Sequence, residues 1–326
     1  MKALVTGGTG FIGCHLIEKL SQRGVEIVSV AKDGQNAELL RQLGAKVITG
    51  DLNNGIRWDE ALDGVDIVFH LAGVTRSRFA RDYYEGNTKA THRFTEVCAL
   101  RAASLKRFVY VSSQTAAGPS PDGSPLVEDA PCHPVSHYGK SKLLAEEEVR
   151  KAGARLPWTI VRPSAVYGPR DREWYEYIRM ILHGFQLLVG FGTKSMNLIH
   201  ADDLADGILL AGTAPQAVGQ TYFLGSERAY STLEIGMMMA RVLNKHAIKV
   251  RVPHALTYAV GAIEGAVGKV TGHDVFFNFQ KAKESVQTAW TCSIEKAKRE
   301  LGFAPHIPLE DGVRSTCEWY RQNRWM

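Results

Sequence analysis

The sequence predicts an α/β protein with a doubly wound parallel sheet, followed by a smaller mixed α/β lobe. In the first half, short apolar runs alternate with amphipathic stretches, which is typical of parallel strands joined by crossover helices. A glycine-rich turn joins the first apolar run to the first amphipathic stretch. The alternation fades after Pro163, and this change of pattern marks the start of the second lobe.

The individual elements follow from hydrophobic periodicity. Apolar runs predict the strands Ala3–Val5, Glu26–Ala31, Ala45–Thr49, Ile67–Leu71, Arg107–Ser112 and Trp158–Arg162. Helical spacing predicts helices from Phe11 to a stop at Gly24 and over Ala37–Leu43, Gly86–Ala103 and Tyr138–Val149. In the second lobe we expect a helix over Trp174–Leu182, a strand near Leu187–Val189 and a helix that opens with the capping box Ser231-Thr232-Leu233-Glu234.

The turn Thr6-Gly7-Gly8-Thr9-Gly10-Phe11-Ile12-Gly13 has the context that a dinucleotide-binding motif requires, because a strand precedes it and a helix follows. Gly7 would permit the tight turn, Gly10 would let the backbone approach a pyrophosphate, and Gly13 would let the helix pack closely on the strand. The N–H groups and the positive dipole end of the helix would then hold the anion. The segment therefore predicts a Rossmann-type sheet that binds a dinucleotide.

A second motif begins the helix after the fifth strand. Tyr138 and Lys142 are four residues apart, so they project from one face of that helix. A tyrosine is a poor base at neutral pH, but a nearby ammonium and the positive ring of an oxidised nicotinamide would stabilise its phenolate. Tyr138 could then exchange a proton with an alcohol or a carbonyl while hydride moves. On its own, this spacing would equally suit a tyrosine and a lysine on the surface of an amphipathic helix.

Composition excludes several classes of protein. The 326 residues include 45% hydrophobic and 22% charged side chains, which is ordinary for a soluble globular chain, and the net charge is only +5. Lysine and arginine are scattered, so we expect no nucleic-acid partner. The five cysteines are widely spaced without metal-binding patterns, which indicates reduced thiols, no metal and a cytoplasmic location. Because the first predicted strand begins at the N-terminus, we expect no secretory signal.

The most apolar stretch, Ala255 to Val270, is interrupted by Glu264 and Lys269, so it does not predict a membrane-spanning helix. Five of its apolar residues would share one helical face: Leu256, Ala259, Val260, Ile263 and Val267. Two interpretations remain open. The face could lie weakly on a membrane surface, or it could cover the substrate pocket.

These motifs together resemble the extended short-chain dehydrogenases/reductases, the NAD-dependent epimerase/dehydratase family. The matching pieces are Thr6–Gly13, Asp51-Leu52, His70-Leu71-Ala72-Gly73, Asn87, Val109-Tyr110-Val111-Ser112-Ser113, Tyr138 with Lys142, Arg162-Pro163, Val166-Tyr167-Gly168-Pro169 and His200-Ala201-Asp202-Asp203. The C-terminal tail, from Trp290-Thr291-Cys292-Ser293 to Trp319-Tyr320, looks similar to the 3-beta-hydroxysteroid dehydrogenase and dihydroflavonol reductase branch. The combination is specific, although each piece alone is common.

The resemblance implies roles for these residues. Tyr138 would be the acid/base, Lys142 would bind the nicotinamide ribose, and Ser113 would hydrogen-bond the reacting oxygen, with Ser112 and Thr115 as alternatives. The implied cofactor contacts are Gly7, Thr9, Gly10, Phe11, Ile12, Gly13, Lys32, Asp51, Leu52, Leu71, Ala72, Gly73, Val111, Tyr138, Lys142, Pro163 and Val166. It also implies a dinucleotide-binding domain over residues 1–163 with a returning segment near 197–213, and a mainly substrate-binding lobe over 164–326.

The end of the second strand bears on the choice of dinucleotide. An NAD enzyme places an acid near this point to bond the ribose hydroxyls, whereas this chain has Ala31-Lys32-Asp33. Ala31 removes a carboxylate that would repel a 2′-phosphate, and Lys32 adds a cation beside it. We therefore expect NADP, while Asp33 keeps NAD as the alternative.

The substrate class is inferred by excluding other reactions of the family. Ser113-Gln114-Thr115 lacks the acid pair of the family's dehydratases, and Met196–Ile199 lacks the arginine with which its epimerases meet a pyrophosphate, although Arg172, Arg179, Lys194 or Arg228 could replace it. The lobe is rich in aromatic and methionine residues, at Trp174, Tyr175, Tyr177, Met237–Met239 and Phe276–Phe279, which would suit an apolar alcohol or ketone.

The leading hypothesis is thus an NADP-linked dehydrogenase or reductase acting on an apolar small molecule of steroid, flavonoid or terpenoid type. One alternative is a nucleotide-sugar epimerase with tightly bound NAD. Another is a dinucleotide-binding sensor or assembly factor without turnover. The resemblance further implies a homodimer formed by the helices over Gly86–Ala103 and Tyr138–Lys151.

Overall fold

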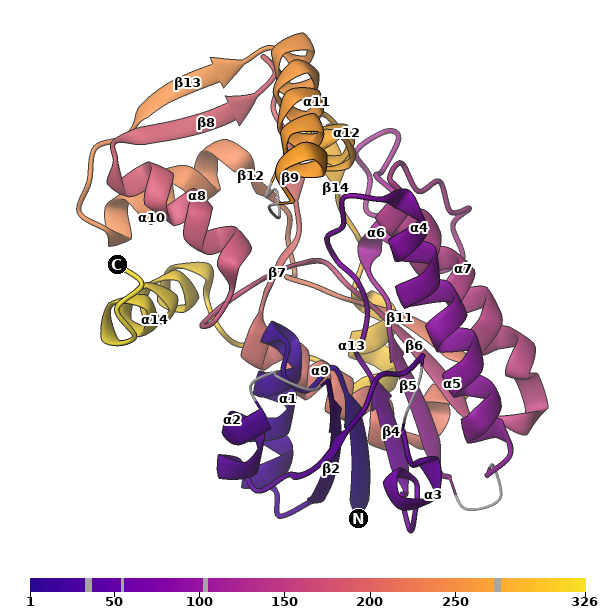
Figure 1. Ribbon diagram of the computed structural model, residues 1–326. Helices are drawn as coiled ribbons and strands as arrows, with labels where there is room; N and C mark the ends of the chain where they lie inside the picture. Colours follow the sequence, from indigo (N-terminus) through magenta and orange to yellow (C-terminus); the bar gives the residue numbers. More distant parts are fainter. Residues whose placement is uncertain (33–36, 54–55, 102–104, 273–276) are drawn as a thin grey trace.

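The computed structural model describes residues 1–32, 37–53, 56–101, 105–272 and 277–326. Within these residues, a parallel seven-stranded sheet has the order β11-β6-β5-β4-β1-β2-β3 (Figure 1). Its strands are β1 (Lys2–Thr6), β2 (Glu26–Ala31), β3 (Lys46–Thr49), β4 (Ile67–His70), β5 (Arg107–Val111), β6 (Trp158–Pro163) and β11 (Gln220–Leu224). The order reverses between β1 and β4, and the crevice at such a switch point is where doubly wound sheets bind nucleotides.

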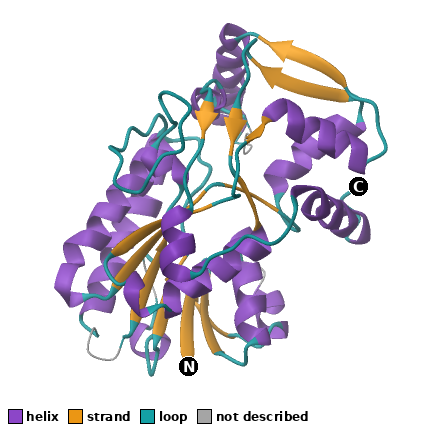
Figure 2. Ribbon diagram, turned by 180° about the vertical axis from the view of Figure 1, so that it is seen from behind, coloured by secondary structure: helices purple, strands orange, loops and turns teal. Residues whose placement is uncertain are grey.

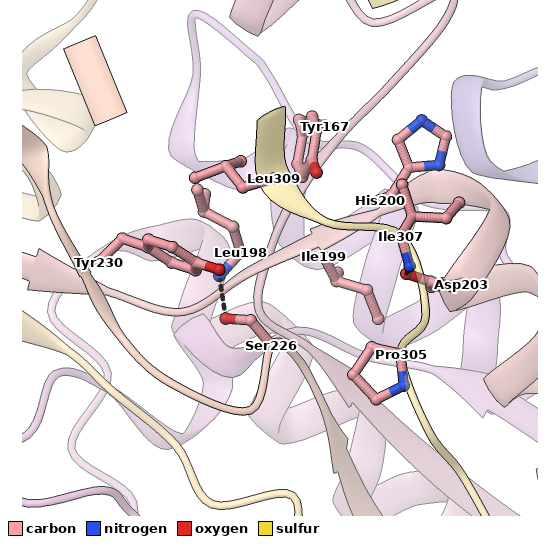
Figure 3. A pocket seen from close by; sticks show the side chains of 10 residues that line it. All are labelled: Tyr167, Leu198, Ile199, His200, Asp203, Ser226, Tyr230, Pro305, Ile307 and Leu309. Carbon is pink, nitrogen blue, oxygen red and sulfur yellow. Dashed lines mark hydrogen bonds between the residues drawn. The ribbon is translucent and has the colours of Figure 1, made fainter. Parts of the chain in front are cut away.

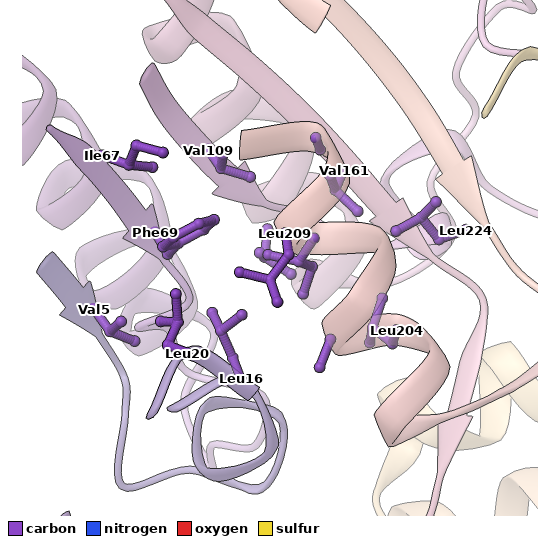
Figure 4. Close-up of a cluster of buried hydrophobic side chains, with 14 of the residues drawn as sticks. Val5, Leu16, Leu20, Ile67, Phe69, Val109, Val161, Leu204, Leu209 and Leu224 are labelled. Atoms are coloured by element: carbon purple, nitrogen blue, oxygen red, sulfur yellow. The ribbon is translucent and has the colours of Figure 1, made fainter. Parts of the chain in front are cut away.

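Successive side chains of each strand enter different cores, because they point to opposite faces of the sheet. Val5 and Phe69 pack under α1 (Phe11–Gln22) and α9 (Ala201–Thr213), as Figure 4 shows. Leu4 packs under the opposite layer, which contains α5 (Ala90–Ala99) and α7 (His137–Ala152). With both faces covered, the strands are buried over almost their whole length, which explains their continuous apolar sequences.

Shorter elements complete the sheet domain. They are α2 (Ala37–Gln42), α3 (Trp58–Ala61), α4 (Ala80–Tyr83), the π-helix η1 (Tyr84–Lys89), α6 (Gln114–Ala117) and the 3-10 helices η2 (Gly153–Arg155) and η3 (Pro215–Ala217). Helix α13 (Glu295–Leu301) comes from far along the chain, yet Ala297 and Leu301 join the same core as α1 and α9. The C-terminal half therefore returns to the sheet with α9, β11 and α13.

The second lobe lies beyond the carboxyl edge of the sheet (Figures 1 and 2). Its strands are β7 (Ala165–Tyr167), β8 (Phe185–Val189), β9 (Ser195–Met196), β10 (Leu198–His200), β12 (Tyr230–Ser231), β13 (Ile248–Val252) and β14 (Ala289–Trp290). Its helices are α8 (Arg172–Leu182), α10 (Thr232–Val242), α11 (His254–Thr271), α12 (Phe279–Ser285) and α14 (Leu309–Gln322). These strands form small sheets of two or three, both parallel and antiparallel.

The predicted fold class is confirmed, and one detail of the predicted elements is wrong. The helix expected over Gly86–Ala103 begins earlier, at Ala80 with α4, continues through η1, and its α-helical part ends at Ala99. In the second lobe, Trp174, Tyr175 and Tyr177 pack against the lobe's own core. Phe276 and Asp33 lie outside the described residues.

Candidate active site

The glycine loop forms a tight cradle at the carboxyl end of β1. Gly7 has φ +74°, and a Cβ on it would lie 2.6 Å from the backbone nitrogen of Ala72. A Cβ on Gly13 would overlap the carbonyl oxygen of Gly7. Gly10 occupies the N-cap of α1, and no side chain of the described residues caps this helix. The loop is thus shaped so that backbone N–H groups at a helix N-terminus can approach an anion, which fits the pyrophosphate of a dinucleotide.

The carboxyl ends of β1 and β4 are held together by a buried hydrogen-bond chain. The Thr6 hydroxyl lies 2.7 Å from Nδ1 of His70, and Nε2 of His70 lies 3.0 Å from the Thr91 hydroxyl. Burial lowers the pKa of His70 to about 3, so its ring is neutral at physiological pH. Thr6 also accepts a 3.3 Å bond from Ala72 N. This chain fixes the segment Leu71–Gly73 beside the glycine loop.

At the other side of the loop, two predicted cofactor contacts are bonded to one another. Lys32 Nζ lies 2.6 Å from a carboxylate oxygen of Asp51. Burial alone would raise the pKa of Asp51, but hydrogen bonds from Lys32 and Asn53 hold it below its usual value. A bound 2′-phosphate would therefore compete with Asp51 for Lys32. Leu52, next in the chain, packs against the core under α5.

The N-cap of α7 determines the position of Tyr138. Ser136 accepts a 3.0 Å bond from Gly139 N and donates a 2.6 Å bond to Glu284 of α12, so it positions the first helical turn against the second lobe. Burial and the Glu284 carboxylate raise the pKa of Tyr138 well above its usual value, and a hydrogen bond to Ser113 opposes this increase. Tyr138 is therefore a protonated phenol at neutral pH in this structure.

The three candidate hydroxyls after β5 have different surroundings. Ser113 caps α6, accepts a 2.9 Å bond from Thr115 and lies near enough to Tyr138 to oppose the increase in its pKa. Ser112 instead donates a 2.6 Å bond to the buried carboxylate of Glu146, away from Tyr138. Ser113 therefore influences the tyrosine, whereas Ser112 is bonded to another group.

Lys142 projects from the same helix face as Tyr138, and its ammonium group is bonded to the end of β5. Its Nζ donates to the carbonyl of Val111 at 2.7 Å and lies 4.3 Å from the centre of the Tyr110 ring. Burial lowers the pKa of Lys142 to about 7, although Glu146 opposes the shift. Lys142 is not among the groups that shift the pKa of Tyr138 in this structure, and the lowering expected from the lysine together with an oxidised nicotinamide stays a prediction.

Two further contacts predicted for the nicotinamide lie at the junction of the lobes. Pro163 ends β6, where it pairs with Leu224 of β11, and Val166 lies in β7 and packs against the core under α9. Ser164, between them, is buried, and its hydroxyl has no protein hydrogen-bond partner among the described residues.

Asn87 has a role that its place in the motif did not reveal. It lies on the π-helix η1, where the extra backbone residue redirects a side chain. Its amide accepts a 2.6 Å bond from Val74 N and donates to Val74 O at 3.0 Å and to Ser141 at 2.9 Å. Asn87 therefore ties the chain after Gly73 to the helix that carries Tyr138.

A charged cluster beside Tyr138 was missed altogether. Glu173 of α8 bonds Lys281 of α12 at 3.0 Å and Arg76, from the sheet domain, at 3.1 Å. Burial alone would favour the neutral forms, but the ion pair raises the pKa of Lys281 and lowers that of Glu173. Both side chains remain 38% exposed. The cluster connects the two lobes next to the tyrosine, and no local sequence pattern joins residues 76, 173 and 281.

The small pocket in Figure 3 lies elsewhere, at the start of α9. It has a volume of about 20 Å³ and is lined by Tyr167, Leu198, Ile199, His200, Asp203, Ser226, Tyr230, Pro305, Ile307 and Leu309. Tyr138 does not border it, so it is not the site of the proposed chemistry. Among the described residues, no group of three or more His, Cys, Asp or Glu side chains could hold a metal ion, and no helix is long and apolar enough to cross a membrane.

A nucleotide cradle at the switch point of a doubly wound sheet, with a tyrosine and a lysine one helical turn apart beside it, defines a class of dinucleotide-dependent enzymes. The model of the NAD dependent epimerase/dehydratase family matches residues 3–225, and the chain belongs to this family. The predicted resemblance is confirmed.

Relatives within the family act on different kinds of molecule. The chain is 29% identical over 323 residues to a ceramide reductase of Caulobacter vibrioides (strain NA1000 / CB15N), covering 99% of this chain and 95% of the relative. It is 30% identical to an uncharacterized UDP-glucose epimerase, YtcB, of Bacillus subtilis (strain 168), covering 96% of each. A 3beta-hydroxysteroid-dehydrogenase/decarboxylase of Arabidopsis thaliana is 25% identical, with 97% of this chain and 61% of that protein covered.

The solved structures confirm the fold. UDP-glucuronic acid 4-epimerase from Bacillus cereus, in complex with UDP-glucuronic acid and NAD, superposes with a TM-score of 0.80 and covers 99% of this chain and 100% of that one. Its sequence identity is 23%, so this similarity defines the architecture and not the substrate.

Proposed function

We propose that this protein is an NADP-linked oxidoreductase that interconverts a carbonyl and a secondary alcohol of an apolar small molecule. The observation that carries the proposal is the position of Tyr138 and Lys142 on one helix, α7, beside a dinucleotide cradle. Family members without turnover tend to lose the tyrosine or the lysine, whereas this chain keeps both.

The described residues fit the cofactor, which supplies or accepts the hydride when bound. The backbone of Gly7–Gly13 would hold the pyrophosphate, Asp51 and Leu52 the adenine, and Lys32 the 2′-phosphate. Leu71, Ala72, Gly73, Val111, Pro163 and Val166 would surround the nicotinamide and its ribose. Lys142 would exchange its bond to Val111 O for the ribose hydroxyls.

Tyr138 performs the proton transfer. Its raised pKa keeps the phenol protonated, so the site is prepared to donate a proton to a carbonyl oxygen. Ser113 holds the same oxygen through a second hydrogen bond.

The cations that could have bound a sugar-nucleotide pyrophosphate have partners within the protein. Lys194 donates to the carbonyls of Ser285 and Gln287, and Arg228 pairs with Glu234. Arg179 pairs with Glu176, and Arg172 lies over the Trp325 ring. This arrangement favours an apolar substrate, as does the similarity to a ceramide reductase. The similarity to a UDP-glucose epimerase keeps epimerisation as the second candidate.

A substrate comparison with the purified protein tests the proposal. We expect NADPH to be consumed with aliphatic ketones, and faster with longer chains. Conversion of UDP-glucose without net consumption of cofactor would instead establish the epimerase. Dinucleotide binding with neither reaction would support the sensor or assembly-factor alternative.

We also propose a cytoplasmic homodimer, formed by α5 and α7. Leu100, next to α5, and Leu144 on α7 are exposed apolar side chains in this region. Light scattering should give twice the mass of the chain, and a monomer would contradict this proposal.

A further inference from the structure

Helix α11 is apolar in sequence, yet most of it faces solvent. Only Thr257, Gly261 and Gly268 are buried. Leu256 is 52% exposed, Ile263 is 63% exposed and Val270 is 87% exposed; Val260 and Val267 are exposed as well. Figure 1 shows α11 at the outer edge of the second lobe. A soluble domain rarely exposes so many large apolar side chains on one helix.

The way in which α11 is seated explains this exposure. A Cβ on Gly261 would lie 2.9 Å from the carbonyl oxygen of Asn278, so a stripe of small residues lets the helix lie very close to the start of α12. The large side chains, at positions 256, 260, 263, 267 and 270, recur at helical spacing and form another face, directed outward. The two faces therefore have separate roles: one anchors the helix, and the other is available for contact.

Further exposed apolar side chains lie on and after the β8–β13 pair that leads into the helix. Phe185 on β8 and Ile248 on β13 are paired in register, and both are exposed. Phe191, which follows β8, is 72% exposed. The backbone of Gly190 bonds Val252 just before α11 begins, which places Phe191 near the N-terminal end of the helix, whereas the Phe185–Ile248 pair lies at the opposite end of the two strands.

The charged residues before and within α11 are mostly positive, which favours an anionic partner. Between residues 245 and 269 the chain carries Lys245, Lys249, Arg251 and Lys269 but only one acid, Glu264. All four cations are exposed. An apolar helical face with exposed cations before its N-terminal end and in its last turn suits an anionic lipid surface, which attracts the cations while the apolar face enters the headgroup boundary. A second copy of the same surface would bring like charges together.

We propose that the outward face of α11, together with Phe191 near its N-terminal end, binds the surface of an anionic bilayer. Helix α12, on which α11 lies, contacts the start of the Tyr138 helix: Gln280 accepts a 3.0 Å bond from His137 N, and Glu284 accepts the bond from Ser136. The bilayer would therefore lie one helix away from the catalytic tyrosine. This position would let a lipid substrate pass from the membrane to the site, and that step alone depends on the proposed function.

Vesicle binding tests the surface directly. The full-length protein should sediment with vesicles of phosphatidylcholine and phosphatidylglycerol, and much less with phosphatidylcholine alone. The double variant Val260→Asp/Ile263→Asp should bind the anionic vesicles at least about tenfold more weakly, because two exposed apolar contacts are lost. Val218→Asp, at an exposed valine of the sheet domain, is the matched control and should bind like the parent protein.

Several outcomes would overturn the proposal. The parent protein could fail to bind anionic vesicles, or the double variant could bind them as well as the parent does. The parent could also be a dimer and the double variant a monomer, which would make this face an interface between copies. Turnover of a short, water-soluble ketone should be the same in the parent protein and the double variant. Vesicle binding without any turnover would uphold the surface and reject the enzymatic function, so the two failures are distinguishable.

Discussion

Lys142 lies one helical turn after Tyr138, but its ammonium group is bonded to the carbonyl of Val111 at 2.7 Å. The lysine is thereby held at the end of β5, next to the proposed nicotinamide position. Burial leaves the pKa of Lys142 at about 7 and that of Tyr138 well above its usual value. The pair thus contains a lysine ready to lose its proton and a tyrosine that keeps its own.

This arrangement predicts a proton release on binding of the oxidised cofactor. The positive nicotinamide ring beside Lys142 would lower the lysine pKa further, so near pH 7 a fraction of a proton leaves the protein. The reduced cofactor has a neutral ring and should release less. Calorimetric titration in buffers of different ionisation enthalpy measures the difference, which should disappear in Lys142→Met. Equal proton release by the two cofactor forms would rule this coupling out.

The buried pair Glu146–Arg162 joins α7, the helix that carries Tyr138, to strand β6. Arg162 donates two bonds to the carboxylate, at 2.7 and 2.9 Å, and both side chains are almost fully buried. Arg162→Met should lower the free energy of unfolding by about 3–5 kcal/mol, because it removes the main partner of a buried charge. The double variant Glu146→Gln/Arg162→Met should lose less. Urea unfolding checks both, and a double variant less stable than Arg162→Met would be the contrary result.

The glycine cradle should not tolerate a side chain. In Gly13→Ala the new Cβ would overlap the carbonyl of Gly7, so the loop must shift and dinucleotide affinity should fall at least about tenfold. Gly192→Ala is a suitable control, because a Cβ there meets no atom within 4 Å. Fluorescence titration with NADPH compares the two variants. Unchanged affinity in Gly13→Ala would show that the loop does not hold the pyrophosphate.

Lys32 should determine the preference between dinucleotides. Lys32→Ala should weaken NADP binding about tenfold, roughly the value of one charge-assisted hydrogen bond, and leave NAD binding unchanged. Lys46→Ala, at the opposite end of the neighbouring strand β3, serves as the control. Parallel titrations with both dinucleotides decide the point. Tighter binding of NAD than of NADP by the parent protein would contradict the predicted preference.

The fold and the central motifs could be predicted because their signals are local. Gly7–Gly13 forms one turn, and Tyr138 and Lys142 are four residues apart on one helix. The Glu173–Lys281 pair has no such signal, since 108 residues separate its members. The lowered pKa of Lys142 could not be predicted from the sequence either, because it depends on the burial of the side chain. The sequence also left the lobe aromatics ambiguous: Tyr175 would suit a ligand pocket or a core, and tertiary packing placed it in the core.

The central claim is that Tyr138 donates the proton in a carbonyl reduction. Its most direct test is the steady-state kinetics of NADPH-dependent ketone reduction by Tyr138→Phe, with Tyr84→Phe as a matched control. Tyr84 is nearby, and its hydroxyl lies 2.9 Å from a nitrogen of His137. We expect Tyr138→Phe to lose about 10²- to 10⁴-fold in kcat while its affinity for NADPH stays unchanged, and Tyr84→Phe to retain most of its activity. Full turnover by Tyr138→Phe would contradict the mechanism.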